Sequence, residues 1–576
     1  MMENFRQALA AGVERLTAWA DLLDRINVFP IADGDTGRNL GISLAPLREI
    51  DRDIQILSRN LLLSARGNSG NIASWFFQCF IQATSRENLP EAVRLGRDRA
   101  WQAVPDPRPG TMLSFFDALT TVLTDSTTLL SVDRIAGILE HLEAGVRDTT
   151  DQQPKLTKAG VVDAGALGLF LYFEGFFHVL TGGRIPFRDV MDTFRNRLQV
   201  SPSYRDNLET GYCVDTVLQS DADTQETAKM LASLCNSIVI TRKDAYLKVH
   251  FHTQKRDDAR RKLVHLGQLI DWTEDDLYQQ TSAFGSTSRE PVIHIMTDAA
   301  GSVTRQEAKS LGISLLDSYI TVGDHCLPET YFSPEELYGA MRAGTRVTTS
   351  QASIFERHQI YASVMSRHRK VLYVCVGSAF TGNYRVVMDW KRESDPEGRL
   401  TVIDTGAASG RLGVLALAIA AYAFEAGESG HVVAFARKAA AHCEEYVFLD
   451  RLEYVAAGGR LSKTGAFFGD MLRMKPIVSP MDEGARKVGV VRNREEQLRF
   501  ALEALGRSLH PGEKAFIMLE YSDNKSWVEE VKSELAKRYA EARIIVHPLS
   551  LTSGAHMGPG TWAVAFLPDM KCTQLG

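Results

Sequence analysis

The run from Asn27 to Asn39, which follows a helical N-terminal segment, holds two carboxylates separated by a single glycine. Asp33 and Asp35 flank Gly34, and amide and hydroxyl side chains stand close by in the sequence. Such a compact group of oxygen atoms suits Mg²⁺, which proteins hold through one or two carboxylates together with substrate phosphates. Gly and Asp also dominate ordinary turns for local reasons. The run alone therefore leaves two interpretations open, a magnesium site and a solvated Asp-Gly turn.

Three glycine motifs follow at points where helices are expected to begin. They are A-R-G-N-S-G-N at residues 65–71, P-G-T-M-L at 109–113 and G-V-V-D-A-G-A-L-G at 160–168. A glycine loop that opens a helix presents free backbone N–H groups, and the helix N-terminus favours anions. Each motif alone is a weak signal, because helices that start beside glycine are common.

Together and in this order, these motifs resemble the nucleotide-binding L domain of dihydroxyacetone kinases, in the version that begins bacterial fatty-acid kinases. The resemblance covers about the first third of the chain. It implies an all-α helical barrel (DhaL-like) that holds ATP at its open mouth, with Mg²⁺ on Asp33 and Asp35 as the catalytic pair and Asn27 as a further contact. It assigns to the nucleotide the residues Asn39, Ser69, Gly70, Thr111, Asp163 and Gly165.

Composition excludes several classes of protein. A chain of 576 residues predicts several domains, and a formal charge of −6 gives no basic footprint for nucleic acid. The 7 cysteines form no C-x-x-C pair, and without a signal peptide they indicate a reducing cytoplasm. No uncharged apolar run approaches the ~18 residues that span a bilayer. The most apolar stretch, 412–426, carries Glu425, and we expect it to be a buried helix.

The residue pattern divides the chain into three expected domains: 1–200, 201–290 and 291–576. The first is helical almost throughout, with apolar residues at helical spacing. The second is a small α+β domain with strands at 212–217, 237–240 and 246–252. The third alternates helices with short strands, which predicts an α/β domain with a largely parallel sheet. The strands expected there are 292–296, 371–376, 400–403, 432–435, 515–519, 543–546 and 562–566.

The middle domain carries a possible zinc site. His250 and His252 alternate on one strand and so share a face, and Cys213 lies on another strand that could be its neighbour. One Cys and two His suit Zn²⁺ with a fourth position left open. A solvated pair of histidines with a buried cysteine is the alternative. The sequences G-Y-C and K-V-H-F-H-T resemble the middle domain of fatty-acid kinases, where the corresponding residues hold zinc.

The C-terminal domain resembles the DegV family, whose two-subdomain members bury a fatty acid in a tunnel. The resemblance rests on T-T-S-Q-A-S at 348–353, G-S-A-F-T-G-N-Y at 377–384, L-E-Y-V-A-A-G-G-R-L-S at 452–462 and G-A-H-M-G-P-G at 554–560. It implies that Thr349 and Thr381 hold the lipid carboxylate, with Arg460 and His556 completing the polar end. We exclude a dinucleotide site at 406–413, because its glycines follow G-x₃-G-x₂-G instead of G-x-G-x-x-G and no acidic residue ends the next expected strand.

The resemblances together imply an ATP- and Mg²⁺-dependent kinase that phosphorylates a long-chain fatty acid held by its own C-terminal domain. The acyl phosphate would feed phospholipid synthesis, and the expected partners are ATP/ADP, a separate DegV-type carrier or acyltransferase, and a second copy in a homodimer. Two alternatives stay open: a non-catalytic lipid-binding protein that senses nucleotide, and a kinase of a small hydroxyl compound such as dihydroxyacetone. The intact Asp-Gly-Asp set counts against the first. No region resembles the substrate domain that the second needs.

Overall fold

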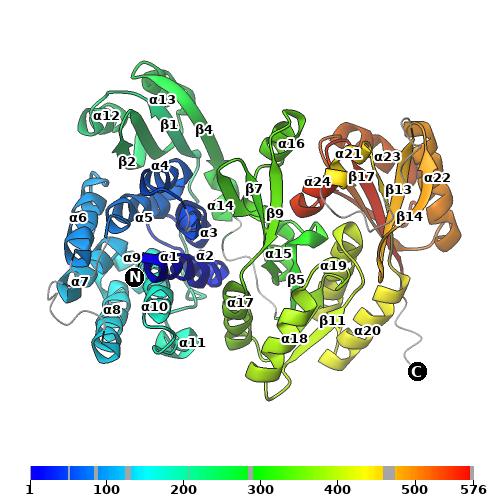
Figure 1. The fold of residues 1–576 in the computed structure, drawn as a ribbon, viewed down its shortest axis with the longest axis horizontal. Helices are drawn as coiled ribbons and strands as arrows, with labels where there is room; N and C mark the ends of the chain where they lie inside the picture. The colour runs from blue at the N-terminus through cyan, green and yellow to red at the C-terminus, as the bar shows by residue number, and fades with distance from the viewer. Residues whose placement is uncertain are drawn as a thin grey trace. The chain divides into compact units, whose positions relative to one another are not determined.

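The computed structural model describes residues 2–49, 52–83, 88–123, 131–206, 208–282, 284, 290–457 and 474–570. The chain forms two compact units, Met1–Ser286 and Thr287–Gly576 (Figure 1). The first unit therefore contains both the expected helical domain and the expected middle domain.

The first unit begins with helices alone. They are α1 (Met2–Thr17), α2 (Ala20–Ile26), α3 (Thr36–Leu44), the short 3₁₀ helix η1 (Ala45–Arg48), α4 (Ile54–Ser64), α5 (Gly67–Phe80), α6 (Leu89–Gln102), α7 (Met112–Leu123), α8 (Val132–Gln152), α9 (Pro154–Ala159), α10 (Ala164–Leu180) and α11 (Val190–Thr193). The helical prediction for this part of the chain is confirmed.

Helix α10 is the buried centre of this group. It is apolar on all sides, its residues from Ala164 to Phe177 are buried, and it contacts α1, α2, α3, α7 and α8. A helix that is apolar all round is stable in water only when other helices cover it. Its one buried acid, Glu174, accepts a hydrogen bond from Arg15 Nη2 at 2.7 Å. Gly175 lets α1 approach closely, because a Cβ there would lie 2.6 Å from the Ala11 carbonyl oxygen.

The rest of the first unit is a four-stranded antiparallel sheet with three short helices. The elements are β1 (Tyr212–Gln219), α12 (Thr224–Leu231), β2 (Cys235–Lys243), β3 (Tyr246–Thr253), α13 (Arg256–Val264), β4 (Gln268–Asp276) and α14 (Leu277–Ser282). The strand order is β2-β3-β1-β4. One face of the sheet packs on α4 and α5. Strand β4 was not expected from the sequence.

The described residues of the second unit form three sheets. A parallel sheet has the order β11-β10-β5-β6, a mixed six-stranded sheet has the order β14-β13-β12-β17-β15-β16, and a small antiparallel sheet has the order β8-β7-β9. The elements are β5 (His294–Asp298), η3 (Ala299–Gly301), α15 (Arg305–Leu311), β6 (Ile313–Leu316), β7 (Ser318–Val322), β8 (His325–Pro328), η4 (Glu329–Tyr331), α16 (Pro334–Arg342), β9 (Val347–Gln351), α17 (Ile354–Arg367), β10 (Val371–Cys375), α18 (Asn383–Ser394), β11 (Leu400–Asp404), α19 (Ser409–Glu425), α20 (Ser429–His442), β12 (Glu444–Phe448), α21 (Leu452–Ala457), β13 (Lys475–Met481), β14 (Gly484–Val491), α22 (Arg494–Ser508), β15 (Ala515–Tyr521), α23 (Lys525–Arg538), β16 (Arg543–Pro548), α24 (Leu551–Met557) and β17 (Trp562–Pro568).

Two expectations for this unit need correction. Residues 432–435 are not a strand but part of α20, because Val432, Ala436 and Ala439 recur at helical spacing and form its buried face. The largely parallel arrangement holds only for the sheet of β5, β6, β10 and β11. In the six-stranded sheet only β15 and β16 pair in parallel.

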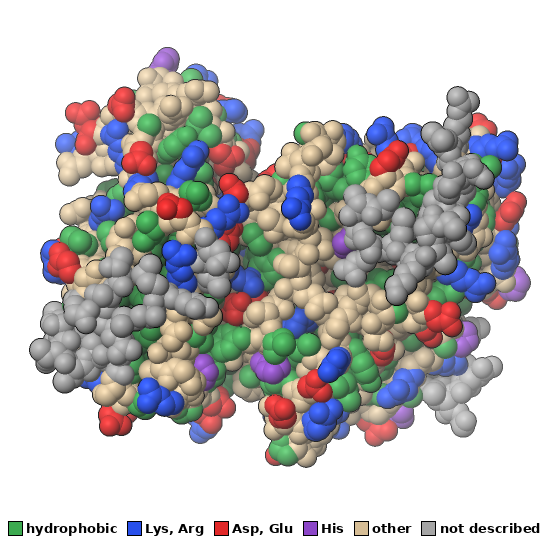
Figure 2. Space-filling view, viewed as in Figure 1, with side chains coloured by type: hydrophobic (Ala, Val, Ile, Leu, Met, Phe, Trp, Pro, Cys, Tyr) green, Lys and Arg blue, Asp and Glu red, His purple; other side chains and the backbone are tan. Residues whose placement is uncertain are grey.

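The apolar stretch at 412–426 lies in α19, and its residues from Leu412 to Leu417 are buried as expected. Among the described residues, no helix combines the length and hydropathy that crossing a bilayer requires. Figure 2 shows acidic and basic side chains interspersed over the visible face of each unit.

Candidate functional site

Within the first unit, one pocket is lined by both the helical part and the sheet. Its volume is about 270 Å³, open solvent included. The helical part contributes the Asp-Gly-Asp loop and the loop that opens α5, and the sheet contributes side chains of β1 and β3. The lining residues are Asn27, Phe29, Pro30, Asp33, Asp35, Thr36, Asn39, Gly67, Asn68, Ser69, Cys213, His250 and His252. The expected magnesium and zinc sites, which the sequence places in separate domains, thus line the same pocket.

The two carboxylates of the Asp-Gly-Asp loop are half-buried beside each other. Asn27 Nδ2 donates a hydrogen bond to Asp33 Oδ1 at 2.5 Å. Burial and the neighbouring Asp35 carboxylate raise the pKa of Asp33 well above its usual range. Burial also raises the pKa of Asp35, although Arg38 opposes this. Two crowded carboxylates that resist ionisation are the donors that a divalent cation would stabilise, so these residues fit Mg²⁺.

Helix packing fixes the loop that opens α5 against α3. Gly67 adopts a left-handed backbone conformation (φ 59°), and a Cβ there would collide with the Asn39 amide. The Ser69 hydroxyl lies 3.4 Å from that of Thr36. Gly70 is buried, and a Cβ there would collide with Ser43. Asn39 and Ser69 therefore reach the pocket, whereas Gly70 serves the close packing of α3 on α5.

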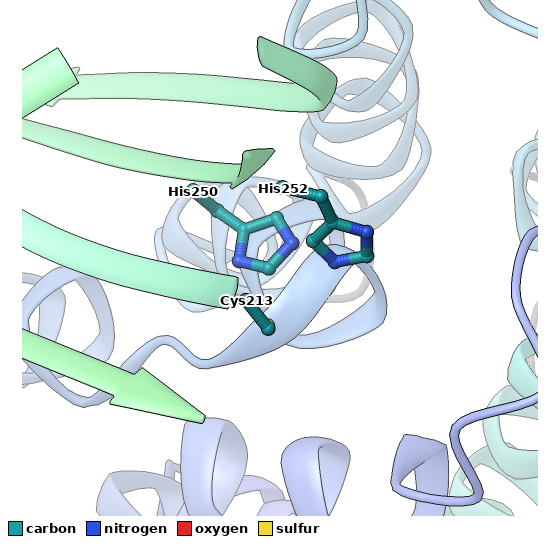
Figure 3. Close-up of side chains that lie close together, drawn as sticks. All are labelled: Cys213, His250 and His252. Atoms are coloured by element: carbon teal, nitrogen blue, oxygen red, sulfur yellow. The ribbon is translucent and has the colours of Figure 1, made fainter. Parts of the chain in front are cut away.

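The sheet brings together the three residues expected to bind zinc. The antiparallel register sets Cys213 on β1 opposite His252 on β3, and His250 shares their face. The Cys213 sulfur and one ring nitrogen of each histidine lie within 4.8 Å of one another. Figure 3 shows the two imidazoles side by side, with the cysteine side chain next to them.

The chemistry of this cluster fits a zinc ion. Nε2 of His250 and Nδ1 of His252 are buried without a hydrogen-bond partner among the described residues, and leaving such buried polar atoms unsatisfied costs free energy. Burial lowers the pKa of His252 to about 3, so its ring is neutral. Burial and nearby carboxylates raise the pKa of the Cys213 thiol well above its usual range. A thiolate at this position needs a cation beside it.

Three more residues expected to bind nucleotide meet elsewhere in the helical part. Asp163 caps α10 by accepting a hydrogen bond from the Ala166 N–H at 2.8 Å, and burial raises its pKa to about 6. A Cβ on Gly165 would lie 3.3 Å from both Asp163 Oδ1 and Met112 Cβ, so this turn adjoins the loop of Thr111. Thr111 is buried, and its hydroxyl donates to the Arg108 carbonyl at 2.9 Å. None of the three belongs to the lining of the pocket.

The residues expected to bind lipid converge only in part. Thr349 on β9 and His556 on α24 are neighbours, with 3.1 Å between Thr349 Oγ1 and His556 Nε2. Thr381 instead accepts the Asn383 N–H at 3.2 Å at the start of α18. Arg460 lies outside the described residues.

The glycine run at 406–413, excluded as a dinucleotide site, opens helix α19. Glu445 accepts hydrogen bonds there from the Gly410 N–H at 3.2 Å and the Arg411 N–H at 3.0 Å. A carboxylate of the protein itself therefore occupies this helix start.

Sequence reasoning missed Asp215, which lies on the same face of β1 as Cys213. It is 6% exposed, and its Oδ2 accepts a hydrogen bond from the Gly67 N–H at 2.9 Å. The signal was present in the alternation of Cys213 and Asp215 on one predicted strand.

Comparisons with known proteins match three parts of the chain. The DAK2 domain matches residues 30–178, the FakA-like middle domain of fatty acid kinases matches 209–284, and the DegV family, described as uncharacterised, matches 292–569. Protein YloV of Bacillus subtilis is 28% identical over 54% of this chain and 64% of its own length. An uncharacterized protein of Staphylococcus saprophyticus is 27% identical over 48% of this chain and 55% of its own length. The chain thus spans well under the full length of these curated relatives.

Two solved structures each cover about half of the chain. A fatty-acid-binding DegV family protein from Thermus thermophilus is 22% identical, covers 48% of this chain and 99% of its own, and has a TM-score of 0.45. DegV of Bacillus subtilis, a fatty acid binding protein, is 18% identical, covers 48% of this chain and 100% of its own, and has a TM-score of 0.45. The three family matches give the chain the architecture of a DAK2 domain followed by a FakA-like middle domain and a DegV-family domain.

Proposed function

We propose that this chain is an ATP- and Mg²⁺-dependent fatty-acid kinase whose DegV-family unit binds the fatty acid. The observation that carries the proposal is the single pocket lined by Asp33 and Asp35, by the loop that opens α5 and by the Cys213–His250–His252 cluster. Carboxylates that can hold Mg²⁺ and backbone N–H groups at a helix start are what phosphate binding and charge neutralisation require, and a candidate zinc cluster lines the same pocket. The family matches over 30–178 and 209–284 support the same activity.

The reaction asks for positioning and charge neutralisation more than for acid–base chemistry. A fatty carboxylate is ionised at neutral pH, because carboxyl groups of this kind have pKa values of ~4–5. Its oxygen attacks the γ-phosphorus of ATP, a new P–O bond forms, and the bond to the β-phosphate oxygen breaks to release ADP. No proton has to be removed from the nucleophile. The product is an acyl phosphate, a mixed anhydride suited to phospholipid synthesis.

The residues of the pocket divide this work. Asp33 and Asp35, with Asn27, would hold Mg²⁺, while Asn39, Ser69 and the N–H groups at the start of α5 would orient the phosphates. Cys213, His250 and His252 would hold Zn²⁺. When bound, the two ions supply positive charge to the phosphate oxygens. Thr111, Asp163 and Gly165 would contact the rest of the nucleotide.

In the second unit, Thr349 and His556 would hold the fatty-acid carboxylate, with Thr381 and Arg460 as further donors. Hydrogen bonds to a charged group are each worth ~1.5–3 kcal/mol, and a buried carboxylate is costly without them. The adjacency of Thr349 and His556 supports this assignment.

The test is to incubate the purified full chain with ATP, Mg²⁺ and a long-chain fatty acid, and to trap acyl phosphate as hydroxamate. We expect hydroxamate from the chain alone and about one zinc per chain by elemental analysis, as a single site of this kind binds one ion. The double change Asp33→Asn and Asp35→Asn should lower the rate by about 10³-fold, or about 4 kcal/mol of transition-state stabilisation, and leave lipid retention intact. The control is Asp148→Asn, an exposed carboxylate of α8.

Three results would change the proposal. Hydroxamate that appears only after a separate DegV-type carrier is added would make the fused unit structural or regulatory. ATP binding with no turnover under any condition would favour a nucleotide-sensing lipid-binding protein. Normal turnover in the double aspartate variant would show that Mg²⁺ is held elsewhere.

A further inference from the structure

Asp215 is a buried carboxylate that contacts both the candidate metal cluster and the first turn of α5. It lies on β1 two residues after Cys213, and the antiparallel register sets it opposite His250 on β3. Its side chain therefore projects from the same face of the sheet as the three expected zinc ligands. It is not among the residues that would hold the ions or the phosphates in the proposed reaction.

One side of the Asp215 carboxylate holds the start of α5. Oδ2 accepts the Gly67 N–H at 2.9 Å, and Oδ1 accepts from Asn71 Nδ2 at 3.0 Å. Asn71 Nδ2 also donates to the Gly67 carbonyl at 2.8 Å. Gly67, Asn68 and Ser69 line the pocket, so the carboxylate fixes the backbone of the segment expected to meet the phosphates.

The same carboxylate also contacts the metal cluster. His250 Nδ1 lies 3.3 Å from Asp215 Oδ2, which leaves His250 Nε2 available to an ion. Carboxylates in this position orient metal-binding histidines, fix their tautomer and raise their basicity. The ammonium of Lys248, which is fully buried, lies 3.8 Å from Oδ1 and balances the charge of the carboxylate.

We propose that Asp215 is a positioning residue that holds His250 and the first turn of α5 (Gly67–Ser69) in one fixed arrangement. The zinc cluster and the phosphate loop then form together, and disturbing either disturbs the other. This inference rests on the proposed function for its catalytic meaning. Its structural content, the coupling of a metal ligand to a loop through one carboxylate, is measurable without turnover.

The decisive variant is Asp215→Asn, which keeps the size of the side chain and removes its charge and one acceptor. The matched control is Asp257→Asn on α13, whose side chain is 78% exposed and lies 3.8 Å from Arg256. Asp215→Glu keeps the charge but displaces the carboxylate by one methylene, and it serves if the Asn variant does not fold. Zinc affinity is measured by competition with a chelator, using Zn²⁺ alone as the probe. Loop order is measured by hydrogen exchange of a peptide that covers 66–71.

We expect Asp215→Asn to bind zinc about 10- to 100-fold more weakly, the usual effect of losing such a partner. We also expect faster exchange at 66–71 and lower kcat in the same variant, and no change in the control. The inference is overturned if zinc affinity and exchange both stay within about twofold of the wild type, or if only one of them changes. A wild-type chain that makes no acyl phosphate refutes the proposed function, whereas the zinc and exchange measurements still decide the role of Asp215.

Discussion

Each unit of the chain uses a buried carboxylate to hold the first turn of a helix that carries candidate functional residues, but the two carboxylates carry different charge. Asp215 accepts the Gly67 N–H at the start of α5, and Glu329 accepts the Thr552 N–H at 3.0 Å at the start of α24. Burial disfavours the charged form of Asp215, but the His250 ring and the Lys248 ammonium beside it, together with the Gly67 N–H, outweigh burial and hold its pKa below the usual range. Burial, aided by a nearby carboxylate, raises the pKa of Glu329 to about 8.

The comparison shows that accepting an N–H at a helix start does not decide whether a buried carboxyl group is protonated. Both carboxylates are almost fully buried, at 6% exposure for Asp215 and 3% for Glu329, and both cap a helix start. The two pKa shifts differ in sign because the His250 ring, the Lys248 ammonium and the Gly67 N–H stabilise the anion of Asp215, whereas the Asp317 carboxylate adds to burial at Glu329. Changes that add or remove charge around the two carboxylates should therefore have opposite consequences.

The largest effect should come from removing the cation beside Asp215. Lys248→Met leaves a buried carboxylate without its ammonium partner, and breaking a buried pair in this way costs about 3–5 kcal/mol of unfolding free energy. The measurement is urea unfolding of the full chain, followed in the first unit. Lys229→Met, which removes an exposed charge on α12, should change stability by less than about 0.5 kcal/mol.

A double variant separates lost charge from lost packing. Lys248→Met together with Asp215→Asn should be less destabilised than the sum of the two single variants, since no unpaired charge remains. Strict additivity, or a loss below about 1 kcal/mol in Lys248→Met alone, would show that the ammonium does not sustain the charge of Asp215.

The contribution of Glu329 to the stability of the second unit should change with pH in the opposite sense from that of an ordinary paired carboxylate. Glu329 keeps its proton in the folded state up to about pH 8, whereas the unfolded chain releases it near its ordinary pKa of ~4.3. Stability is therefore full below that pH and falls as pH rises toward 8, by up to about 1.4 kcal/mol per pH unit for this group. Between about pH 5 and 7 the loss is about 2–3 kcal/mol. Thermal unfolding at several pH values measures it.

Glu329→Gln should remove this part of the pH dependence, because the amide keeps the shape and cannot ionise. Glu503→Gln, at an exposed position of α22, should leave the profile unchanged. A Glu329→Gln profile that matches the wild type would mean that Glu329 is ionised in the folded unit, as Asp215 is in the first.

The sequence predicts arrangements that depend on neighbouring residues or neighbouring strands, but not those that depend on the docking of distant parts of the chain. His250 and His252 share a face through strand alternation alone, and Cys213 joins them through pairing of neighbouring strands. The approach of this cluster to the Asp-Gly-Asp loop depends on the docking of the sheet on α5, which no local pattern specifies. Asp215 was overlooked because an acid on a strand is usually exposed, and only that docking buries it. Residues 432–435 were misassigned because two adjacent valines favour a strand unless the longer helical spacing is counted.

A change at Gly70 tests whether this glycine of the 65–71 motif serves helix packing or ligand contact. Gly70→Ala should destabilise the first unit by about 1–3 kcal/mol, since the added methyl group collides with Ser43 and the α3 backbone. Gly137→Ala in α8, where nothing lies within 4 Å, should stabilise by about 0.5–1 kcal/mol. Chemical denaturation of both variants, with ATP affinity alongside, is the measurement. If Gly70→Ala leaves stability unchanged but abolishes ATP binding, Gly70 contacts the nucleotide and does not serve packing alone.

The smallest effect should appear between the two lipid-site residues that are neighbours. Thr349 Oγ1 and His556 Nε2 lie 3.1 Å apart, so Thr349→Val and His556→Phe should each weaken fatty-acid binding. In a double-mutant cycle their effects should couple by about 1 kcal/mol, the net value of one hydrogen bond. Thr381→Val serves as the contrast, because its hydroxyl meets the Asn383 N–H instead, and it should add independently of His556. Affinity is measured by displacement of a fluorescent fatty acid from the full chain. Coupling of Thr381 as strong as that of Thr349 would show that the bound lipid draws all three groups together, and that the partial convergence seen here is completed by the ligand.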